Sequence, residues 1–247
     1  MNSLASSSDA PGMFPNTRWS VVLAATHPDS PESAQALETV CRAYWRPLYA
    51  YVRCCGQSPP DAQDLTQEFF RRLLEKHRLE DADRRKGRLR TFLVLALKHF
   101  MANEWRRAAA QKRGGHQSSV PLDTEFAESR YAADPGLTPD EVYDRQWALT
   151  LLDLTLHKLR AEFAATGKAG DFDTLKGCLL ADHGAIDYSA MARRLGVNAA
   201  AARVAVHRLR KRFRLLYREE IAQTLADGAD LDGELRHLAA ALAYEGK

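Results

Sequence analysis

The chain has 247 residues, enough for one large domain or two modest ones, and its 35 Lys and Arg against 32 Asp and Glu give a net charge of +3. No apolar run approaches the roughly 18 residues that span a bilayer. The N-terminal MNSLASSSDAPG lacks the basic start and apolar stretch of a signal peptide. The four cysteines (Cys41, Cys54, Cys55 and Cys178) follow neither a CxxC nor a disulfide-framework pattern. These features argue against a membrane protein and favour a cytoplasmic protein with reduced thiols.

The charge is unevenly distributed along the chain. Residues 35–115 hold 17 basic and 9 acidic side chains, and residues 150–218 hold 13 and 6. The segments 116–149 and 219–247 each hold 2 basic and 7 acidic side chains. Two basic blocks separated by acidic segments suggest two modules that bind one polyanion.

Helical spacing of apolar residues begins at Ser33, after a Ser-rich N-terminal extension (residues 1–32) that we expect to be partly disordered. A first helix is predicted to end at Gly56, and its periodic positions are Leu37, Val40, Cys41, Tyr44, Trp45, Leu48, Tyr51 and Val52. Pro59 and Pro60 suit the first turn of a second helix. That helix, DAQDLTQEFFRRLLEKH, is predicted to bury Leu65, Phe69, Phe70 and Leu73.

A third helix is predicted from about Arg90 to Gln111. Its periodic set comprises Phe92, Leu95, Ala96, His99, Phe100 and Asn103. It ends in a basic run before Gly114. We therefore predict a first helical domain over residues 33–113.

Residues 114–137 carry Gly, Pro and acidic residues with few periodic apolar positions, which predicts a flexible linker. Thr138 is a candidate N-cap for a helix that carries Trp147 and a series of leucines up to Leu159. One further helix is predicted around Phe172, Leu175 and Leu179. A second domain is predicted over residues 138–218.

The second domain contains the signature of a helix-turn-helix. Asp187 can cap a helix whose apolar stripe is Tyr188, Met191, Ala192 and Leu195. Gly196 can end that helix, because only Gly adopts positive φ cheaply, and Asn198 can cap the next one. Two helices joined by a Gly-containing turn of about three residues are typical of this motif.

The helix predicted after Asn198 is amphipathic, with apolar and basic residues on different faces. Its apolar stripe is Ala202, Val206, Leu209, Phe213 and Leu216. Its other faces hold Arg203, His207, Arg208, Arg210, Lys211, Arg212 and Arg214. A cationic helix with a small-sided first turn can enter the DNA major groove and neutralise phosphates.

Residues 219–247 form a predicted C-terminal helical extension. Leu231, Leu235, Leu238 and Leu242 repeat at helical spacing, and Asp230 or Asp232 can cap the helix they imply. Because this acidic tail follows a basic block, we expect it to pack on the second domain and to tune the access of that domain to DNA or to a protein partner. The alternative is that it only completes the core of that domain.

Two stretches resemble a known family. DAQDLTQEFFRRLLE, followed by GRLRTFLVLALKHFMANEWRR, resembles region 2 of the extracytoplasmic-function sigma factors of bacterial RNA polymerase. The stretch at 187–214, continuing to HRLRKRFRLLYREEI, resembles region 4 of the same family. The resemblance covers about 35–113 and 147–218, in the family's order and at its usual separation.

The resemblance implies roles for three sets of residues. The helix matching Asp61–Leu74 would dock on the polymerase's largest subunit through Asp64, Gln67 and Glu68. The helix matching Arg90–Arg107 would melt the promoter and read its downstream box through Lys98, His99, Asn103, Trp105, Arg106 and Arg107. Asn103 stands where the family often has Asp. Two alternatives stay open here, namely a core role for His99 and packing of Trp105 on the first helix.

The third set would read the upstream promoter box. Arg203 and His207 are the candidates for base-edge contacts, while Arg208, Lys211 and Arg212 would hold phosphates. Asn198 and Ala200 lie in the first turn of the same helix and complete the set. The small residues from Ala199 to Ala202 replace types common in the family, so the preferred DNA sequence cannot be read from this stretch.

These patterns predict an all-α protein with two small helical domains, a flexible linker and a C-terminal helical extension. The predicted function is promoter-specific transcription initiation, with core RNA polymerase and promoter DNA as partners. An anti-sigma factor or another regulator is a further candidate partner. The alternative is a free-standing helix-turn-helix regulator. An enzyme using Cys41, Cys54, Cys55 and a histidine is disfavoured because no HExxH, CxxC or phosphate loop appears. We expect no catalytic residue, metal or cofactor.

Overall fold

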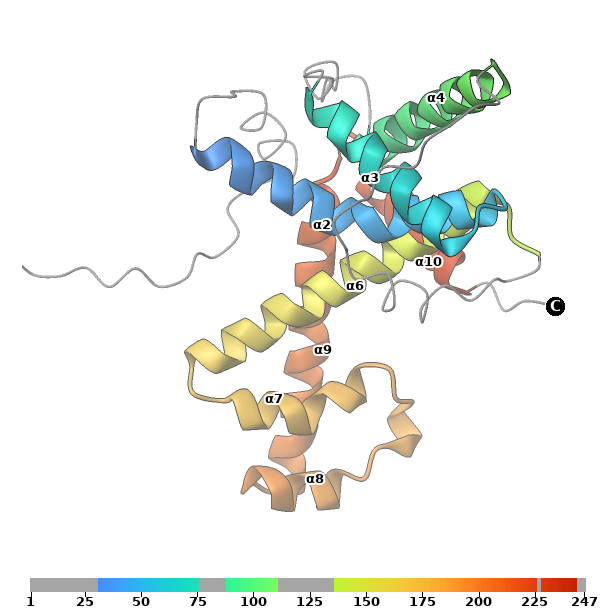
Figure 1. The fold of residues 1–247 in the computed structure, drawn as a ribbon. Helices are drawn as coiled ribbons and strands as arrows, with labels where there is room; N and C mark the ends of the chain where they lie inside the picture. Colours follow the sequence, from blue (N-terminus) through green and yellow to red (C-terminus); the bar gives the residue numbers. More distant parts are fainter. Residues whose placement is uncertain (1–30, 76–87, 111–135, 226–227, 244–247) are drawn as a thin grey trace, which may run out of the picture.

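The computed structural model describes residues 31–75, 88–110, 136–225 and 228–243 (Figure 1). The α-helices among them are α2 (Pro31–Cys54), α3 (Pro59–Glu75), α4 (Leu89–Ala110), α6 (Pro139–Ala165), α7 (Ala169–Leu175), α8 (Tyr188–Leu195), α9 (Ala199–Ala222) and α10 (Leu231–Ala243). Two short 3-10 helices, η2 (Lys176–Leu179) and η3 (His183–Ala185), separate α7 from α8. The described part contains no strand, which confirms the all-α class. Nearly all of the predicted N-terminal extension and most of the predicted linker lie outside the described residues.

The helix ends follow the local signals in the sequence. Thr138 and Glu141 form a reciprocal capping box at the start of α6. Asp187 accepts hydrogen bonds from the backbone N–H groups of Ser189 and Ala190, both at 2.9 Å. Gly196 ends α8 with φ of 67°, a left-handed conformation that disfavours any residue with a Cβ. Asn198 then caps α9 through the N–H of Ala201 at 2.8 Å.

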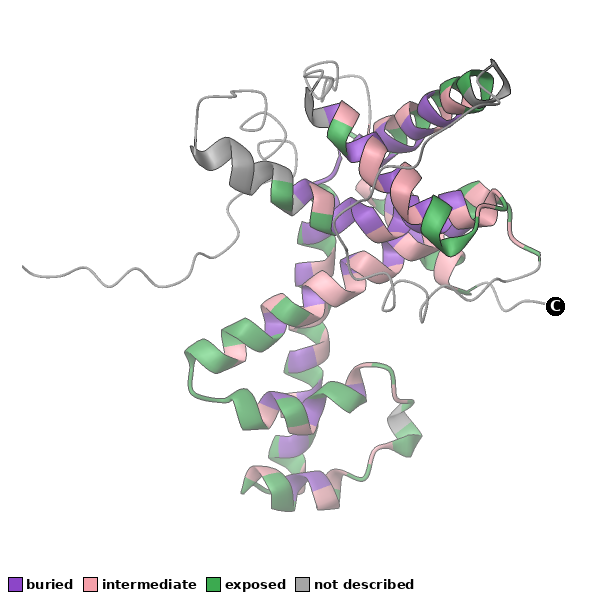
Figure 2. Ribbon diagram, in the orientation of Figure 1, coloured by how far each residue is buried: buried purple, intermediate pink, exposed green. Residues whose placement is uncertain are grey.

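A first hydrophobic core joins helices from distant parts of the sequence. It contains the apolar faces of α2, α3 and α4, the first half of α6, the last turns of α9, and α10. All predicted core positions of α2 from Val40 to Val52 pack in or against this core. In Figure 2 the buried residues of these helices meet in the upper part of the molecule. The core therefore brings the helices predicted for the first domain together with parts of those predicted for the second.

A second, smaller core lies at the other end of α6 and α9. It is built from Leu159, Phe172, Leu175, Cys178, Met191, Ala192, Ala202, Val206, Leu209 and Leu216. The apolar stripes predicted for α8 and α9 pack in or against it. Figure 1 shows α6 and α9 running continuously from the upper helices to the α7–α8 end. Because the two cores do not coincide with the two predicted domains, we call residues 33–113 the first segment and residues 138–218 the second segment.

The buried face of α4 differs from the one predicted. Leu89, Leu93, Leu97, Phe100 and Met101 are buried, whereas Leu95 is 47% exposed and His99 and Asn103 are exposed. The stretch FLVLAL is apolar on every face of the helix, so helical periodicity alone does not select one. Packing against α2 and α3 selects it instead.

The C-terminal helix α10 forms as predicted. Asp230 caps it by accepting a hydrogen bond from the N–H of Gly233 at 2.8 Å. Leu238 is fully buried, and Leu231, Leu235 and Leu242 pack against the same first core. The helix packs on α6 and α9, and its Glu234 bonds to Arg90 of α4. Its surroundings therefore extend beyond the second segment to the first.

Candidate polymerase and nucleic-acid interface

The three candidate polymerase contacts lie together on α3. Asp64, Gln67 and Glu68 are all half-buried. Glu68 accepts hydrogen bonds from the Nε groups of Arg71 and Arg72, each at 2.6 Å. The Arg71 bond, reinforced by Arg72, lowers the pKa of the Glu68 carboxyl despite its partial desolvation. Glu68 is therefore ionised at neutral pH and already carries guanidinium partners of its own.

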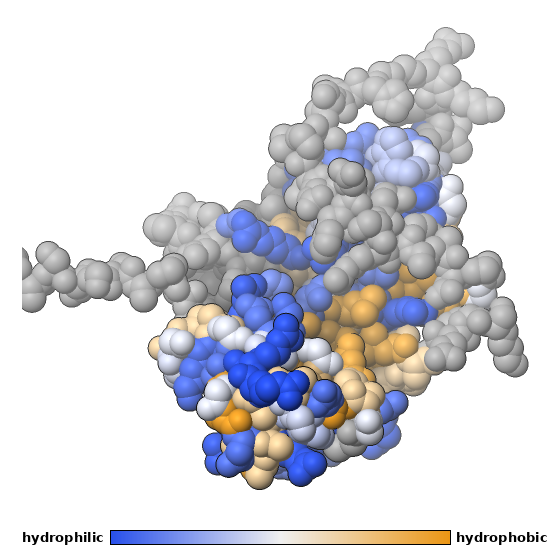
Figure 3. Space-filling model, turned by 90° about the horizontal axis from the view of Figure 1, so that it is seen from below, coloured by the Kyte–Doolittle hydropathy of each residue, from blue (hydrophilic) through white to orange (hydrophobic). Residues whose placement is uncertain are grey.

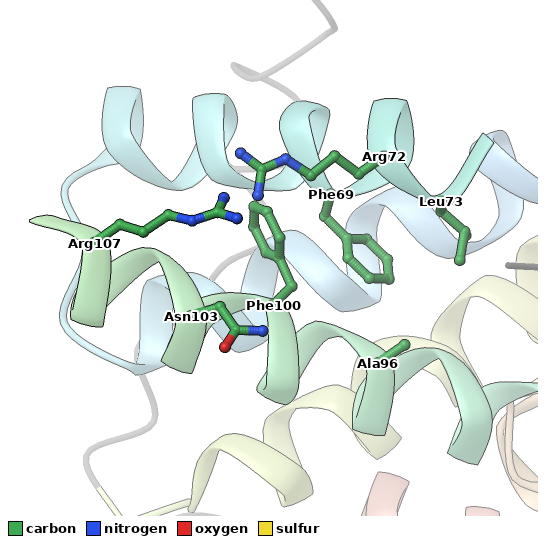
Figure 4. Close-up of a pocket in the computed structure, with 7 residues that line it drawn as sticks. All are labelled: Phe69, Arg72, Leu73, Ala96, Phe100, Asn103 and Arg107. Atoms are coloured by element: carbon green, nitrogen blue, oxygen red, sulfur yellow. The ribbon is translucent and has the colours of Figure 1, made fainter. Parts of the chain in front are cut away.

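A pocket lies between α3 and α4. Its lining residues are Phe69, Arg72, Leu73, Ala96, Phe100, Asn103 and Arg107. Figure 4 shows Arg72 and Arg107 reaching from the two helices to the same end of the pocket, beside the Phe100 ring. The Arg72 guanidinium lies 5.1 Å from the centre of that ring.

Glu104 connects the two arginines of the pocket. Its Oε1 accepts from Nη1 of Arg72 at 2.6 Å and from Nη1 of Arg107 at 2.9 Å. The site thus combines aromatic rings with two guanidinium groups held at one carboxylate. Because Phe69 and Phe100 are both buried, a nucleic-acid strand at this site would meet the guanidinium groups and not an open ring face. Sequence reasoning placed Asn103 and Arg107 in this set but missed Arg72, because α3 was interpreted only as a polymerase-binding helix.

The other residues predicted for the downstream box occupy different environments. His99, Trp105 and Arg106 are exposed, so a core role for His99 is wrong. Trp105 is 50% exposed, and its packing on the first helix stays a prediction. Lys98 instead lies against the second segment, where its Nζ bonds to the two carboxylate oxygens of Asp140 at 2.7 and 2.9 Å. Five of the six predicted residues therefore lie on the exposed surface of α4, namely His99, Asn103, Trp105, Arg106 and Arg107. The sixth, Lys98, is paired with α6.

The first half of α9 carries the residues predicted for the upstream box. Asn198, Ala200, Arg203, His207, Arg208 and Lys211 are all exposed. The Arg203 guanidinium lies 5.2 Å from the centre of the Tyr188 ring of α8, which limits where it can point. Viewed from the α8 end, hydrophilic residues cover much of the near face, with hydrophobic ones among them (Figure 3). The geometry leaves this set accessible to a ligand.

Two other arginines of α9 have structural partners. Arg210 donates from Nε to the backbone carbonyl of Cys178 at 2.8 Å and from Nη2 to that of Ala181, which ties α9 to the η2 region. Arg212 forms a bidentate pair with Glu162 of α6, with its Nε at 2.9 Å. The basic run therefore divides into exposed cations and cations that hold the fold, a division that helical spacing did not reveal. Arg212 was predicted to hold a phosphate, but the structure pairs it with a carboxylate of α6.

The cysteines do not form a metal site in the described part of the chain, where no group of three His, Cys, Asp or Glu is placed to hold an ion. Burial raises the pKa of the Cys41 thiol to about 11, with the nearby Glu38 adding to the shift. Desolvation likewise raises the pKa of Cys54 and of Cys55. None of the described helices is long and apolar enough to cross a membrane.

Comparison with known proteins identifies one domain. Residues 40–111 match the family described as sigma-70 region 2, a range that covers α2 from Val40 onward, α3 and α4. The search of curated proteins gave no match, and neither did the search of solved structures. The matched range contains both the α3 contact set and the α3–α4 pocket. The chain thus contains a sigma-70 region 2 domain, and this domain supports a sigma factor role in transcription initiation by RNA polymerase.

Proposed function

We propose that the protein is a sigma factor of the extracytoplasmic-function type, which directs core RNA polymerase to promoters by binding two DNA boxes. The observation that carries this proposal is the sigma-70 region 2 match over residues 40–111. The free-standing helix-turn-helix regulator remains the alternative, but it gives no role to that domain.

In this proposal α3 contacts the polymerase. Asp64, Gln67 and Glu68 form a polar, acidic row that suits arginine and amide partners on another helix. Glu68 would exchange one of its own arginine partners for one on the polymerase, so that the carboxylate stays paired throughout. Phe69 lies directly beneath this row in the first core and fixes the helix that presents it.

The two DNA sites differ in what they offer. The α3–α4 pocket, with the exposed Trp105 and Arg106 beside it in sequence, would hold an unstacked strand of the downstream box. The exposed first half of α9 would enter the major groove at the upstream box. Arg203 and His207 would meet base edges there, while Arg208 and Lys211 would meet phosphates. An anti-sigma factor or another regulator is the further partner we propose.

Reconstitution with core polymerase tests the proposal directly. The purified full chain is mixed with core polymerase, and co-purification and run-off transcription on genomic fragments of the source organism are measured. We expect a stable complex and transcripts that start at a small set of positions. Specific DNA binding by the chain alone, without any association with core polymerase, would favour the free-standing regulator instead.

A further inference from the structure

The helix α10 carries a buried carboxylate at the junction of three helices. Glu234 has no exposed surface. Its Oε1 accepts from Nε of Arg90 at 2.8 Å, and its Oε2 lies 2.8 Å from Nη1 of Arg88. Arg88 lies just before α4 and Arg90 lies in its first turn, so both belong to the first segment. They lie more than 140 residues before Glu234. The tail is therefore joined to the first segment by charge as well as by its leucines.

The same arginine connects the tail to α6. Nη1 of Arg90 bonds to Oδ1 of Asp144, and the other oxygen of Asp144 lies 2.7 Å from Nε2 of His237 on α10. The Tyr143 hydroxyl donates to the backbone carbonyl of Arg90 at 2.9 Å. We call the side chains Arg88, Arg90, Asp144, Glu234 and His237 the latch. Through it, α10 adds charged contacts to both α4 and α6, which also share the first core.

Holding α6 in this position has a consequence one helical turn earlier. Asp140 and Asp144 are four residues apart and so lie on the same face of α6. While Asp144 is bound to Arg90, Asp140 meets Lys98 of α4 with both carboxylate oxygens. Lys98 also lies 5.7 Å from the centre of the Tyr51 ring. A cation proposed to meet the DNA strand is thus neutralised by a carboxylate of the protein itself.

The tail also neutralises cations directly. Arg88, whose side chain is 36% exposed, pairs with Glu234, and Arg218 at the end of the basic α9 pairs with Asp232 at 2.8 Å. A cation with an internal carboxylate partner must give up that pair before it can neutralise a phosphate, and this cost weakens DNA binding. The acidic residues of α6 and α10 therefore compete with nucleic acid for the same basic groups.

We propose that α10 is an autoinhibitory latch. It holds α6 on α4 so that Asp140 and Glu234 occupy Lys98 and Arg88, and single-stranded DNA binds weakly until the latch opens. A buried ion pair suits this role, because its Coulomb gain largely offsets its desolvation cost while it fixes one arrangement of the helices. The inference rests on the proposed function in treating α4 as a surface for a DNA strand.

The experiment measures binding of the full chain to a 30-nucleotide single-stranded DNA of mixed sequence over a range of KCl concentrations. Asp140→Asn frees one cation, so the slope of log K against log salt should steepen by about 0.7. Glu234→Gln frees Arg88 and loosens Lys98, so the slope should steepen by about 1.4. Asp61→Asn is the matched control, because it removes an exposed carboxylate that accepts a hydrogen bond from Ser58 and should leave the slope unchanged.

The same variants are then compared in run-off transcription with core polymerase, where Asp140→Asn and Glu234→Gln should both give more transcript than the wild type. Slopes equal to those of the wild type, or reduced transcription with the fold retained, would overturn the latch. Should Glu234→Gln unfold, Asp232→Asn takes its place, because this α10 side chain is 64% exposed and its loss frees Arg218, so the slope should steepen by about 0.7. Steeper slopes without any transcript from wild type or variants would reject the proposed function and keep the latch.

Discussion

The ring of Tyr44 lies stacked on that of Trp147, with centroids 4.4 Å apart and planes inclined by 10°. Both side chains are fully buried, and the contact joins α2 of the sigma-70 region 2 domain to α6 of the second segment. Stacked aromatic pairs add to the free energy gained from burial alone. The two segments are therefore joined at the centre of the first core and not only at its surface.

Replacing Trp147 should destabilise both segments together. Trp147→Ala removes a fully buried side chain and should lower the free energy of unfolding by about 3–5 kcal/mol. Chemical denaturation followed by circular dichroism measures this loss. Trp105→Ala, at a half-exposed position, is the control and should change the free energy by at most about 0.5 kcal/mol. If Trp147→Ala unfolds the α2–α4 helices but leaves α7–α9 intact, as shown by hydrogen exchange, the coupling between the segments is refuted.

The α3 face should be needed for polymerase binding but not for folding. Asp64→Arg combined with Gln67→Ala reverses one charge and removes one amide from the row, so the affinity for core polymerase should fall at least tenfold. Helical content should stay unchanged, because both positions lie outside the cores. Co-purification with core polymerase and circular dichroism measure the two properties. Asp61→Asn, one turn earlier, serves as the control, and an unaltered affinity in the double variant would remove α3 from the interface.

Replacing Arg203 and replacing Lys211 should weaken DNA binding in different ways. Arg203→Ala should cost about 1–3 kcal/mol of discrimination between a promoter duplex and a scrambled one, because it removes a base-edge contact. Lys211→Ala should weaken both duplexes alike and reduce the salt slope by about 0.9, because it removes a phosphate contact. Competition binding on promoters selected by run-off transcription separates these outcomes. Equal loss on both duplexes for Arg203→Ala would make it a phosphate contact as well.

The half-buried thiols should react slowly in the folded protein. The pKa of Cys41 is raised to about 11, and those of Cys54 and Cys55 are also raised, so the reactive thiolate is scarce at pH 8. Reaction with a disulfide reagent should be at least tenfold slower in buffer than in denaturant. The raised pKa values also make stability depend on pH. As the pH rises, the thiols of the unfolded chain ionise before those of the folded protein, so the free energy of unfolding should fall above about pH 9. Fast labelling of Cys54 and Cys55 in the native state would instead support a redox role for that pair.

Local signals predicted the helix ends well. Asp187, Gly196 and Asn198 act on backbone groups within four residues, so the sequence around each contains nearly all that determines its conformation. The leucines of α10 were predictable for a similar reason, because they are the only large apolar side chains of the helix and form one stripe. In α4 several faces are apolar, and the prediction was right for Phe92, Ala96 and Phe100 but wrong for the exposed Leu95, His99 and Asn103.

Long-range ion pairs could not be predicted. Glu234 reads as a solvated residue of an acidic tail, yet it is buried because two arginines about 145 residues earlier meet it. Lys98 and Arg210 read as cations available to DNA, whereas one pairs with Asp140 and the other holds the backbone at Cys178. The partner of each charge depends on how helices far apart in sequence pack, and sequence spacing contains no such information. The candidate site was accordingly predicted residue by residue, but not the internal partners that restrain it.

The helix α9 has its last turns in the first core and its exposed first turn at the opposite end of the molecule. At 24 residues it is a rod about 36 Å long. A tilt of about 5° at the embedded end would move the far tip by about 3 Å, close to the rise of one base pair. Such a rod amplifies small rearrangements: a partner that repacks the Ile221 and Leu225 end by less than the width of an atom could shift the register in which Arg203 and His207 meet DNA.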